Sequence, residues 1–213
     1  VRTVQEHFAE ARSDFGDCRD RYPEGPLSLN CGLWHGLTWF FERDYDQALI
    51  ELESLVPSAR GHTLYPEIIY RIASTRYAQR DLDRAEKDLA GFLQEFPNHG
   101  REAEALVLLG DTLMGSGDLD RALEAFRKVP EEMVTQSTYA AFQIGKILKA
   151  QESYEEMSDH YEAYASRPGP PPRVSEALYW VGWAEDRMGR PASAEPIFLD
   201  ALARFGNDPE ATE

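Results

Sequence analysis

Apolar residues recur along this chain at the spacing of helix faces, and the clearest example lies between Ala105 and Val129. One apolar stripe, at intervals of three and four residues, is followed by a break and then by a second stripe. Gly115 and Gly117 form the break, and Asp118 is of a type that caps a helix N-terminus. The segment therefore predicts two helices joined by a short turn. The two stripes comprise Leu106, Leu109, Gly110 and Leu113, then Leu119, Ala122, Leu123, Phe126 and Val129.

The same pattern occurs five times in phase. A small residue marks the close-packing position of each first helix, at intervals of 37, 37, 35 and 37 residues. The second helix follows with a cap eight residues later, a packing position after twelve and a large apolar residue after sixteen. Five copies in phase predict an array of helical repeats. The small residues are Gly36, Ala73, Gly110, Gly145 and Gly182; the caps are Asp44, Asp81, Asp118, Ser153 and Arg190; the packing residues are Ala48, Ala85, Ala122, Met157 and Ala194; the large residues are Leu52, Leu89, Phe126, Tyr161 and Phe198.

The array predicts five hairpins over residues 28–206, with half a repeat before them. Residues 1–27 are interpreted as the second helix of an incomplete repeat, with Phe15 and Cys18 at packing positions. Because its partner helix would precede Val1, we expect the chain to be part of a longer protein. Residues 207–213 are interpreted as a frayed tail or the start of a further repeat. The five repeats are placed at about 28–64, 65–101, 102–136, 137–173 and 174–206.

This pattern resembles the tetratricopeptide repeat (TPR), whose consensus positions match Gly110, Ala122 and Phe126 and whose terminal proline matches Pro97. The resemblance covers residues 28–206. It implies an all-α fold: antiparallel helical hairpins stacked as an α–α superhelix, a right-handed solenoid, with the first helices lining a concave groove.

Two places depart from the regular pattern. Pro196 lies within the second helix of the last repeat, where proline should kink the helix or weaken its first turns. The Pro-rich segment 166–174 replaces the usual short turn before that repeat, and we interpret it as a surface loop.

The resemblance also implies which side chains face the groove. They lie three residues before and one and four residues after each small residue, with further positions six before and five after. Many are aromatic, and aromatic side chains anchor protein interfaces. We therefore expect a groove that holds a peptide or a helix, unless these side chains close the core between adjacent first helices. The candidate partner-binding residues are Leu33, Leu37, Phe41, Tyr70, Tyr77, Asp111, Tyr139, Phe142, Lys146, Tyr179 and Trp183.

The net charge is −16, from 22 basic and 38 acidic residues. This charge argues against non-specific binding to nucleic acid or to an anionic membrane, because both attract positive proteins. It is compatible with basic partners, and it also keeps a surface soluble. No apolar run approaches the length of a membrane-spanning helix.

Cys18 and Cys31 are the two cysteines. Two cysteines make neither a disulfide framework nor a zinc site, and they would pair only in an oxidising compartment. We interpret them as two buried thiols that pack as small apolar side chains.

The sequence offers no catalytic constellation, metal site or cofactor motif. The five histidines are scattered, and neither HExxH nor GxSxG occurs. Acidic pairs such as Asp118 and Asp120 lie at turns and helix ends, where capping explains them. We therefore expect a protein that is not an enzyme and that needs no cofactor.

The function predicted is a scaffold that binds a partner protein or peptide in the groove. The alternative is a structural spacer or self-association segment of a larger protein. The basic groove residues with which some TPR domains clamp a C-terminal carboxylate are absent, since Leu33, Tyr70 and Glu104 stand in such places. The junctions DRYPEGPLS and QEFPNHGREAEAL resemble those of bacterial cell-envelope TPR proteins, namely the outer-membrane assembly lipoprotein and the Tol–Pal-associated protein. This resemblance favours the bacterial envelope, or periplasm, over the cytoplasm.

Overall fold

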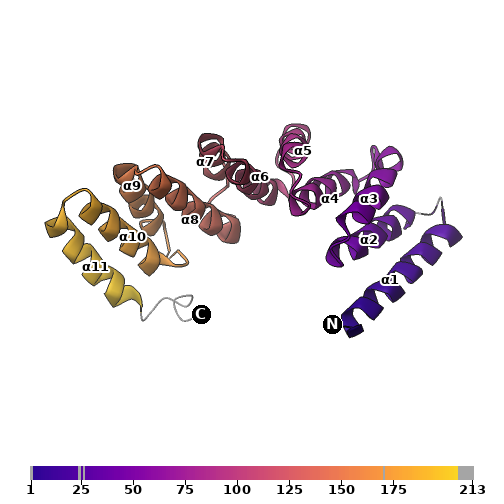
Figure 1. The fold of residues 1–213 in the computed structure, drawn as a ribbon, viewed down its shortest axis with the longest axis horizontal. Coiled ribbons are helices and arrows are strands. Elements are labelled where there is room, and N and C mark those ends of the chain that lie inside the picture. Colours follow the sequence, from indigo (N-terminus) through magenta and orange to yellow (C-terminus); the bar gives the residue numbers. More distant parts are fainter. Residues whose placement is uncertain (1, 24, 26, 170, 206–213) are drawn as a thin grey trace. The chain divides into compact units, whose positions relative to one another are not determined.

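The computed structural model describes residues 2–23, 25, 27–169 and 171–205. Within this part of the chain the regular structure is entirely helical (Figure 1), as the repeat pattern predicted. The proposed tail, residues 207–213, lies outside the described residues. The helices are α1 (Arg2–Arg21), α2 (Ser28–Phe41), α3 (Tyr45–Ala59), α4 (Tyr65–Ala78), α5 (Leu82–Glu95), α6 (Glu102–Ser116), α7 (Leu119–Arg127), α8 (Val134–Ala150), α9 (Tyr154–Ala165), α10 (Val174–Arg187) and α11 (Pro191–Phe205).

One turn geometry follows every first helix. The residue seven positions after each small residue has a positive φ, and the next backbone N–H donates to a carbonyl five residues back, which is a Schellman ending. Glycine occupies this left-handed position in two repeats, whereas arginine or glutamate occupies it in the other three. The turn is therefore fixed by its hydrogen bonds even where the residue type does not favour it. The five residues are Arg43, Arg80, Gly117, Glu152 and Gly189.

Asp44 and Asp81 act as caps through their side chains. Asp44 accepts from the Gln47 amide at 3.2 Å, and Asp81 accepts from the Arg84 amide at 3.3 Å. Ser153 is the N-cap residue of α9 as predicted, but its side chain makes no capping hydrogen bond to that helix. Its backbone bond to Leu148 at 2.9 Å already fixes this helix start. Helix α11 runs continuously through Pro196.

The chain divides into two compact units, Val1–Asp118 and Leu119–Glu213. In the N-terminal unit, α2 to α5 pack in sequence, and Leu52 and Ile68 belong to a core shared by α2, α3 and α4. Leu33 and Leu37, which were expected in the groove, belong to this core and are 5% and 3% exposed. The expectation was wrong for these two residues because their helix face packs against α3 and α4 and does not face solvent.

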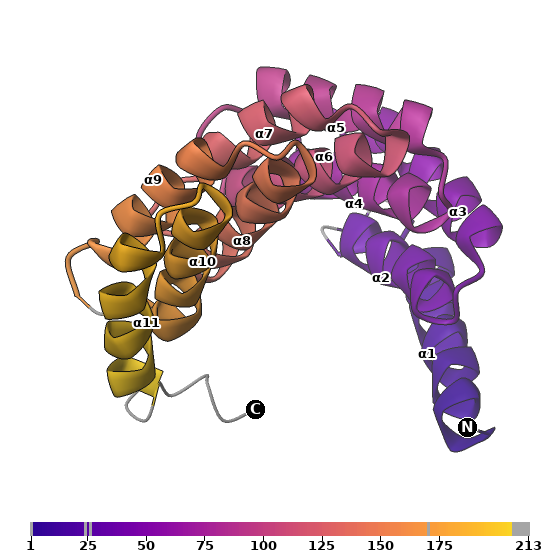
Figure 2. The ribbon, with the colours of Figure 1, turned by 60° about the vertical axis from the view of Figure 1, so that its left-hand side comes forward.

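In the C-terminal unit, α9 packs against both α8 and α10, and α10 packs against α11 (Figure 2). The small residues and the large apolar residues sixteen positions later meet where the helices cross. A Cβ atom added at Gly145 would lie 2.0 Å from the hydroxyl oxygen of Tyr161, and one added at Gly182 would lie 2.8 Å from the Phe198 ring. Glycine at these positions therefore lets an aromatic ring lie against the backbone of the first helix.

Cys18 and Cys31 form a disulfide between α1 and α2, with their Cα atoms 6.3 Å apart. The interpretation as free buried thiols was wrong. The packing position of Cys18 faces α2, where the stacked pair of Phe15 and Trp34 also joins the two helices. The disulfide thus ties the half repeat to the first complete hairpin.

None of the helices in the described ranges combines the length and the apolar character that crossing a bilayer requires.

Candidate functional site

A pocket of about 350 Å³ lies in the C-terminal unit between the first helices α8 and α10, with α9 behind it. Several of its lining residues stand at the positions predicted to face the groove. In α8 these are Tyr139, Phe142, Lys146 and Lys149, which lie six and three residues before and one and four residues after Gly145. The other lining residues are Gln143, Gly145, Met157, Tyr161, Arg173, Glu176 and Trp180.

The inner wall of the pocket is aromatic. The Phe142 and Tyr161 rings lie 5.4 Å apart between centroids. Burial raises the pKa of the Tyr161 hydroxyl well above its ordinary value of 10.0, so this group stays neutral. The wall therefore offers apolar ring surface with one neutral hydroxyl.

Cations rest on the rings around this pocket. The Lys149 ammonium lies 4.4 Å from the centre of the Trp180 ring and 4.7 Å from that of Trp183. The Arg173 guanidinium lies 3.7 Å from the centre of the Phe142 ring. Such contacts hold each cation over a ring face while leaving its outer N–H groups for other acceptors.

The pocket is locally basic in an acidic protein. Three of its lining residues are cationic, Lys146, Lys149 and Arg173, and only Glu176 among them is acidic. Two of the chain's four lysines are therefore in this pocket, although the chain carries a net charge of −16. Arg173 is paired with Glu176 at 2.7 Å, whereas the lysines of the pocket have exposed side chains.

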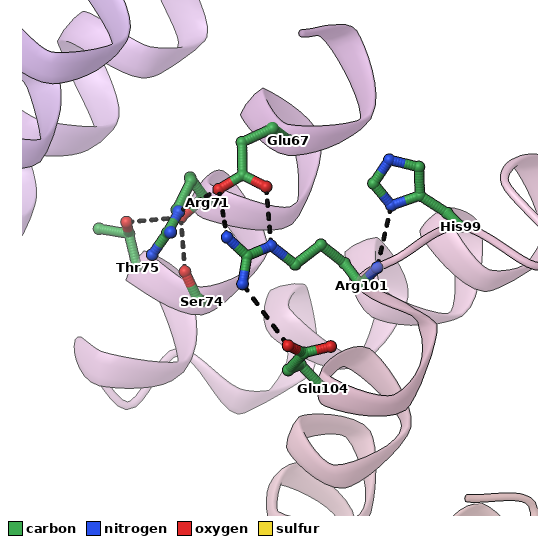
Figure 3. Close-up of polar contacts among 7 residues, drawn as sticks. All are labelled: Glu67, Arg71, Ser74, Thr75, His99, Arg101 and Glu104. Atoms are coloured by element: carbon green, nitrogen blue, oxygen red, sulfur yellow. Dashed lines mark hydrogen bonds and ion pairs between the residues drawn. The ribbon is translucent and has the colours of Figure 1, made fainter. Parts of the chain in front are cut away.

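At the corresponding position of the N-terminal unit, Glu67 lies between Arg71 and Arg101, and Arg101 also contacts Glu104 (Figure 3). Glu67 in α4 accepts two hydrogen bonds from Arg101, at 2.8 and 3.1 Å, and one from Arg71 at 2.7 Å. Arg101 also lies 3.6 Å from Glu104 and 5.5 Å from the centre of the Tyr70 ring. The charged groups of this cluster and the Tyr70 ring are thus paired with one another within the chain.

The pKa of Glu67 reflects these hydrogen bonds and ion pairs. Burial alone would raise its pKa, but the hydrogen bonds and charges of Arg101 and Arg71 outweigh burial and hold the pKa below the ordinary 4.5. Burial likewise raises the pKa of Tyr70. At neutral pH this cluster is a carboxylate bound between two guanidinium groups, with little charge left for a partner.

The structure brings three of the predicted residues, Tyr139, Phe142 and Lys146, into one pocket, and Trp183 adjoins it through Lys149. Phe142 is only 4% exposed, so the expectation of a free groove residue was wrong, and its ring is part of the inner wall. The remaining predicted residues lie elsewhere: Phe41 and Tyr179 are exposed, Tyr70, Tyr77 and Asp111 are half-buried in the N-terminal unit, and Leu33 and Leu37 are in the core.

Sequence reasoning missed Arg173 and Trp180. Arg173 lies near the end of the Pro-rich segment 166–174 and immediately precedes α10, outside the helical positions that the periodicity marks. A signal for it exists, because arginine stands nine residues before the small residue in two repeats, at Arg101 and Arg173.

Comparison with known proteins agrees with this architecture. The sequence profile described as "Tetratricopeptide repeat" matches residues 70–132 and 139–210. Solved structures of MamA share the fold at low identity. "Crystal structure of MamA protein" superposes with a TM-score of 0.62 at 17% identity, over 84% of this chain and 93% of that one. "MamA 41-end from Desulfovibrio magneticus RS-1" gives 0.60 at 17%, over 87% and 99%. No curated protein sequence matches.

Proposed function

We propose that this chain, which belongs to the tetratricopeptide repeat family, is a protein-interaction scaffold that holds a peptide segment of a partner protein in the pocket between α8 and α10. The observation that carries this proposal is the coincidence of two features. The pocket of about 350 Å³ is the surface that predicted groove positions line, and it combines ring surface with exposed cations. Peptide-binding sites pair apolar walls with a few placed polar groups in this way.

The N-terminal unit has a different part in this proposal. Its equivalent surface is occupied by the Glu67–Arg101 pair, so it supports the array and leaves binding to the C-terminal unit. In this proposal the C-terminal unit binds the partner, and the N-terminal unit acts as the structural spacer of the alternative function.

The location that the proposal favours is an oxidising compartment such as the bacterial cell envelope. The disulfide between Cys18 and Cys31 supports it, since such bonds persist in oxidising compartments and are rare in the cytosol. Alkylation of free thiols in intact cells tests this location. A chain that resists alkylation until it is reduced agrees with it, and a chain that is alkylated at once contradicts it.

Selection of binders from a random peptide display library tests the pocket. Selected peptides are synthesised with a fluorescent label, and their affinity is measured by anisotropy for the wild type and for Tyr139→Ala. Tyr139 is 40% exposed on the pocket, so its loss should weaken binding about tenfold without unfolding the chain. Tyr22→Ala is the matched control, because Tyr22 is an exposed tyrosine far along the chain from the pocket. Peptides that bind all three proteins equally would place the binding surface elsewhere.

A further inference from the structure

Two arginines occupy equivalent places in different repeats. Arg101 and Arg173 are the residues that immediately precede α6 and α10, nine residues before the small residues Gly110 and Gly182. Each lies within ion-pair distance of a glutamate three residues later. Arg101 reaches Glu104 only at 3.6 Å, whereas Arg173 contacts Glu176 through two nitrogens, at 2.7 and 2.8 Å.

Each arginine also lies over an aromatic ring of the preceding first helix. Arg101 is 5.5 Å from the centre of the Tyr70 ring, and Arg173 is 3.7 Å from that of Phe142. Tyr70 and Phe142 are themselves equivalent, since both stand three residues before the small residue of their repeat. The two sites therefore share an arginine, its glutamate and the ring beneath it.

They differ in the carboxylate that crosses from the preceding first helix. Glu67, six residues before Ala73, binds Arg101 through two hydrogen bonds. The residue six before Gly145 is Tyr139, which lines the pocket together with Arg173 but has no charge to offer it. The C-terminal site thus has no crossing carboxylate, and Glu176 of α10 contacts the Nε and Nη2 atoms of Arg173 that correspond to those Glu67 binds in Arg101.

We infer that an acidic side chain of the bound peptide supplies the negative charge that this pocket lacks, and that it binds beside the exposed Lys146 and Lys149, next to the Arg173–Glu176 pair. This inference rests on the proposed function and deepens it, because it assigns the chemistry of the occupant as an anionic peptide segment.

The arrangement of the rings argues against a cationic occupant. Rings in a pocket can bind an ammonium group on their faces, but here Arg173 covers Phe142 and Lys149 lies close to Trp180. An incoming cation would meet these charges, whereas an incoming carboxylate would find charge-assisted hydrogen-bond donors. Charge complementarity therefore selects an anion, even though the chain as a whole is acidic.

The first arm of the test varies the peptide. A display-selected peptide is synthesised with its acidic residues intact, with each replaced by its amide, and with phosphoserine in their place. The amide form should bind about tenfold more weakly or worse, since it loses a charged hydrogen-bond acceptor. The phosphoserine form identifies the source of the anion: stronger binding than the carboxylate form assigns a phosphate, and weaker binding assigns a carboxylate. Equal binding of the amide and acidic forms would overturn the inference.

The second arm varies the protein. Tyr139→Glu restores to this site the carboxylate that Glu67 supplies in the N-terminal unit, and it should abolish binding of the acidic peptide. Tyr22→Glu introduces the same charge at another exposed tyrosine and should leave binding unchanged. If Tyr139→Glu does not fold, the lysines provide an independent variant.

Lys146→Gln with Lys149→Gln removes two charges from the pocket, and Lys87→Gln with Lys128→Gln removes two from exposed positions outside it. Loss of binding in the first pair alone supports the inference, and equal affinity of both pairs overturns it. The outcomes also separate the two proposals. If the selected peptides are neutral and lose affinity for Tyr139→Ala, the proposed function holds and the anionic occupant is refuted. If their affinity is unchanged by every pocket variant, both proposals are refuted.

Discussion

Replacing Gly145 by alanine tests the helix crossing that builds the back of the pocket. The added methyl group would lie 2.0 Å from the Tyr161 hydroxyl oxygen and 2.3 Å from the ring carbon that bears it, where an ordinary contact is at least 3.4 Å. Tyr161 would have to move by more than about 1 Å in a packed site. Overlap this deep belongs in the upper part of the usual overpacking range, at about 2–3 kcal/mol. Alanine gains roughly 1 kcal/mol in helix propensity over glycine, so we expect a net loss of about 1–2 kcal/mol.

The assay is urea unfolding followed by far-UV circular dichroism. Gly91→Ala is the control, because Gly91 is an exposed residue within α5 with nothing within 4 Å of an added Cβ. It should stabilise the chain by roughly 1 kcal/mol through propensity alone.

The same array supplies a rescue for Gly145→Ala. Ala73 stands sixteen residues before Leu89, both fully buried, so alanine is tolerated where the partner is leucine. Combining Gly145→Ala with Tyr161→Leu should therefore lose less stability than the sum of the two single changes, by about 1–2 kcal/mol. Additive losses, or a neutral Gly145→Ala, would refute the packing argument.

Three further predictions follow from charge and from the disulfide. Because Glu67 has a lower pKa folded than unfolded, its stabilisation is complete above the ordinary 4.5 and is lost as pH falls through the folded value. In urea unfolding at pH 7, Glu67→Gln should lower the free energy of unfolding by about 1–2 kcal/mol, a modest loss because Arg101 is partly exposed to solvent. The difference between variant and wild type should vanish in acid, and a difference that stays constant with pH would contradict the ion pair. Burial lowers the pKa of His160 below 6.5 in the folded chain, so the unfolded chain takes up the imidazole proton at a higher pH than the folded chain does. The melting temperature should therefore fall as pH drops below 6.5. His160→Gln should remove this pH-dependent loss, and a variant with the same pH profile as the wild type would contradict the prediction. Reducing the Cys18–Cys31 disulfide, whose cysteines are 13 residues apart, should lower the free energy of unfolding by about 2–3 kcal/mol and speed amide hydrogen exchange in α1. Exchange rates that are the same with and without reductant would show that packing alone holds α1 in place.

The helices could be predicted because repetition multiplies a weak local signal. One segment such as 105–129 is an ordinary amphipathic pattern, but the same spacing at Gly36, Ala73, Gly145 and Gly182 fixes the hairpins. The left-handed turn residues could not be predicted in the same way. Arginine at positions 43 and 80 gives no local preference for a positive φ, and the hydrogen bonds of the turn impose it.

The surface was harder to predict because a helix rotation of one residue moves a side chain by about 100°. Leu33 and Phe142, three residues before their small residues, were expected in the groove, but this face packs against neighbouring helices. The disulfide required a distance that sequence does not supply. Arg173 is itself the left-handed residue, at φ 58°, that ends the Pro-rich loop, and the periodicity of the helix faces does not mark this position.

The four lysines of the chain allow a direct measurement of whether a partner peptide binds between α8 and α10, because two of them line that pocket. Reductive methylation with ¹³C labels all four, and lysine-to-arginine variants assign the methyl signals. On titration with a display-selected acidic peptide, the account predicts that the signals of Lys146 and Lys149 shift in a saturable way while those of Lys87 and Lys128 stay in place. Shifts at Lys87 or Lys128, with the two pocket lysines unmoved by a peptide that binds, would contradict it.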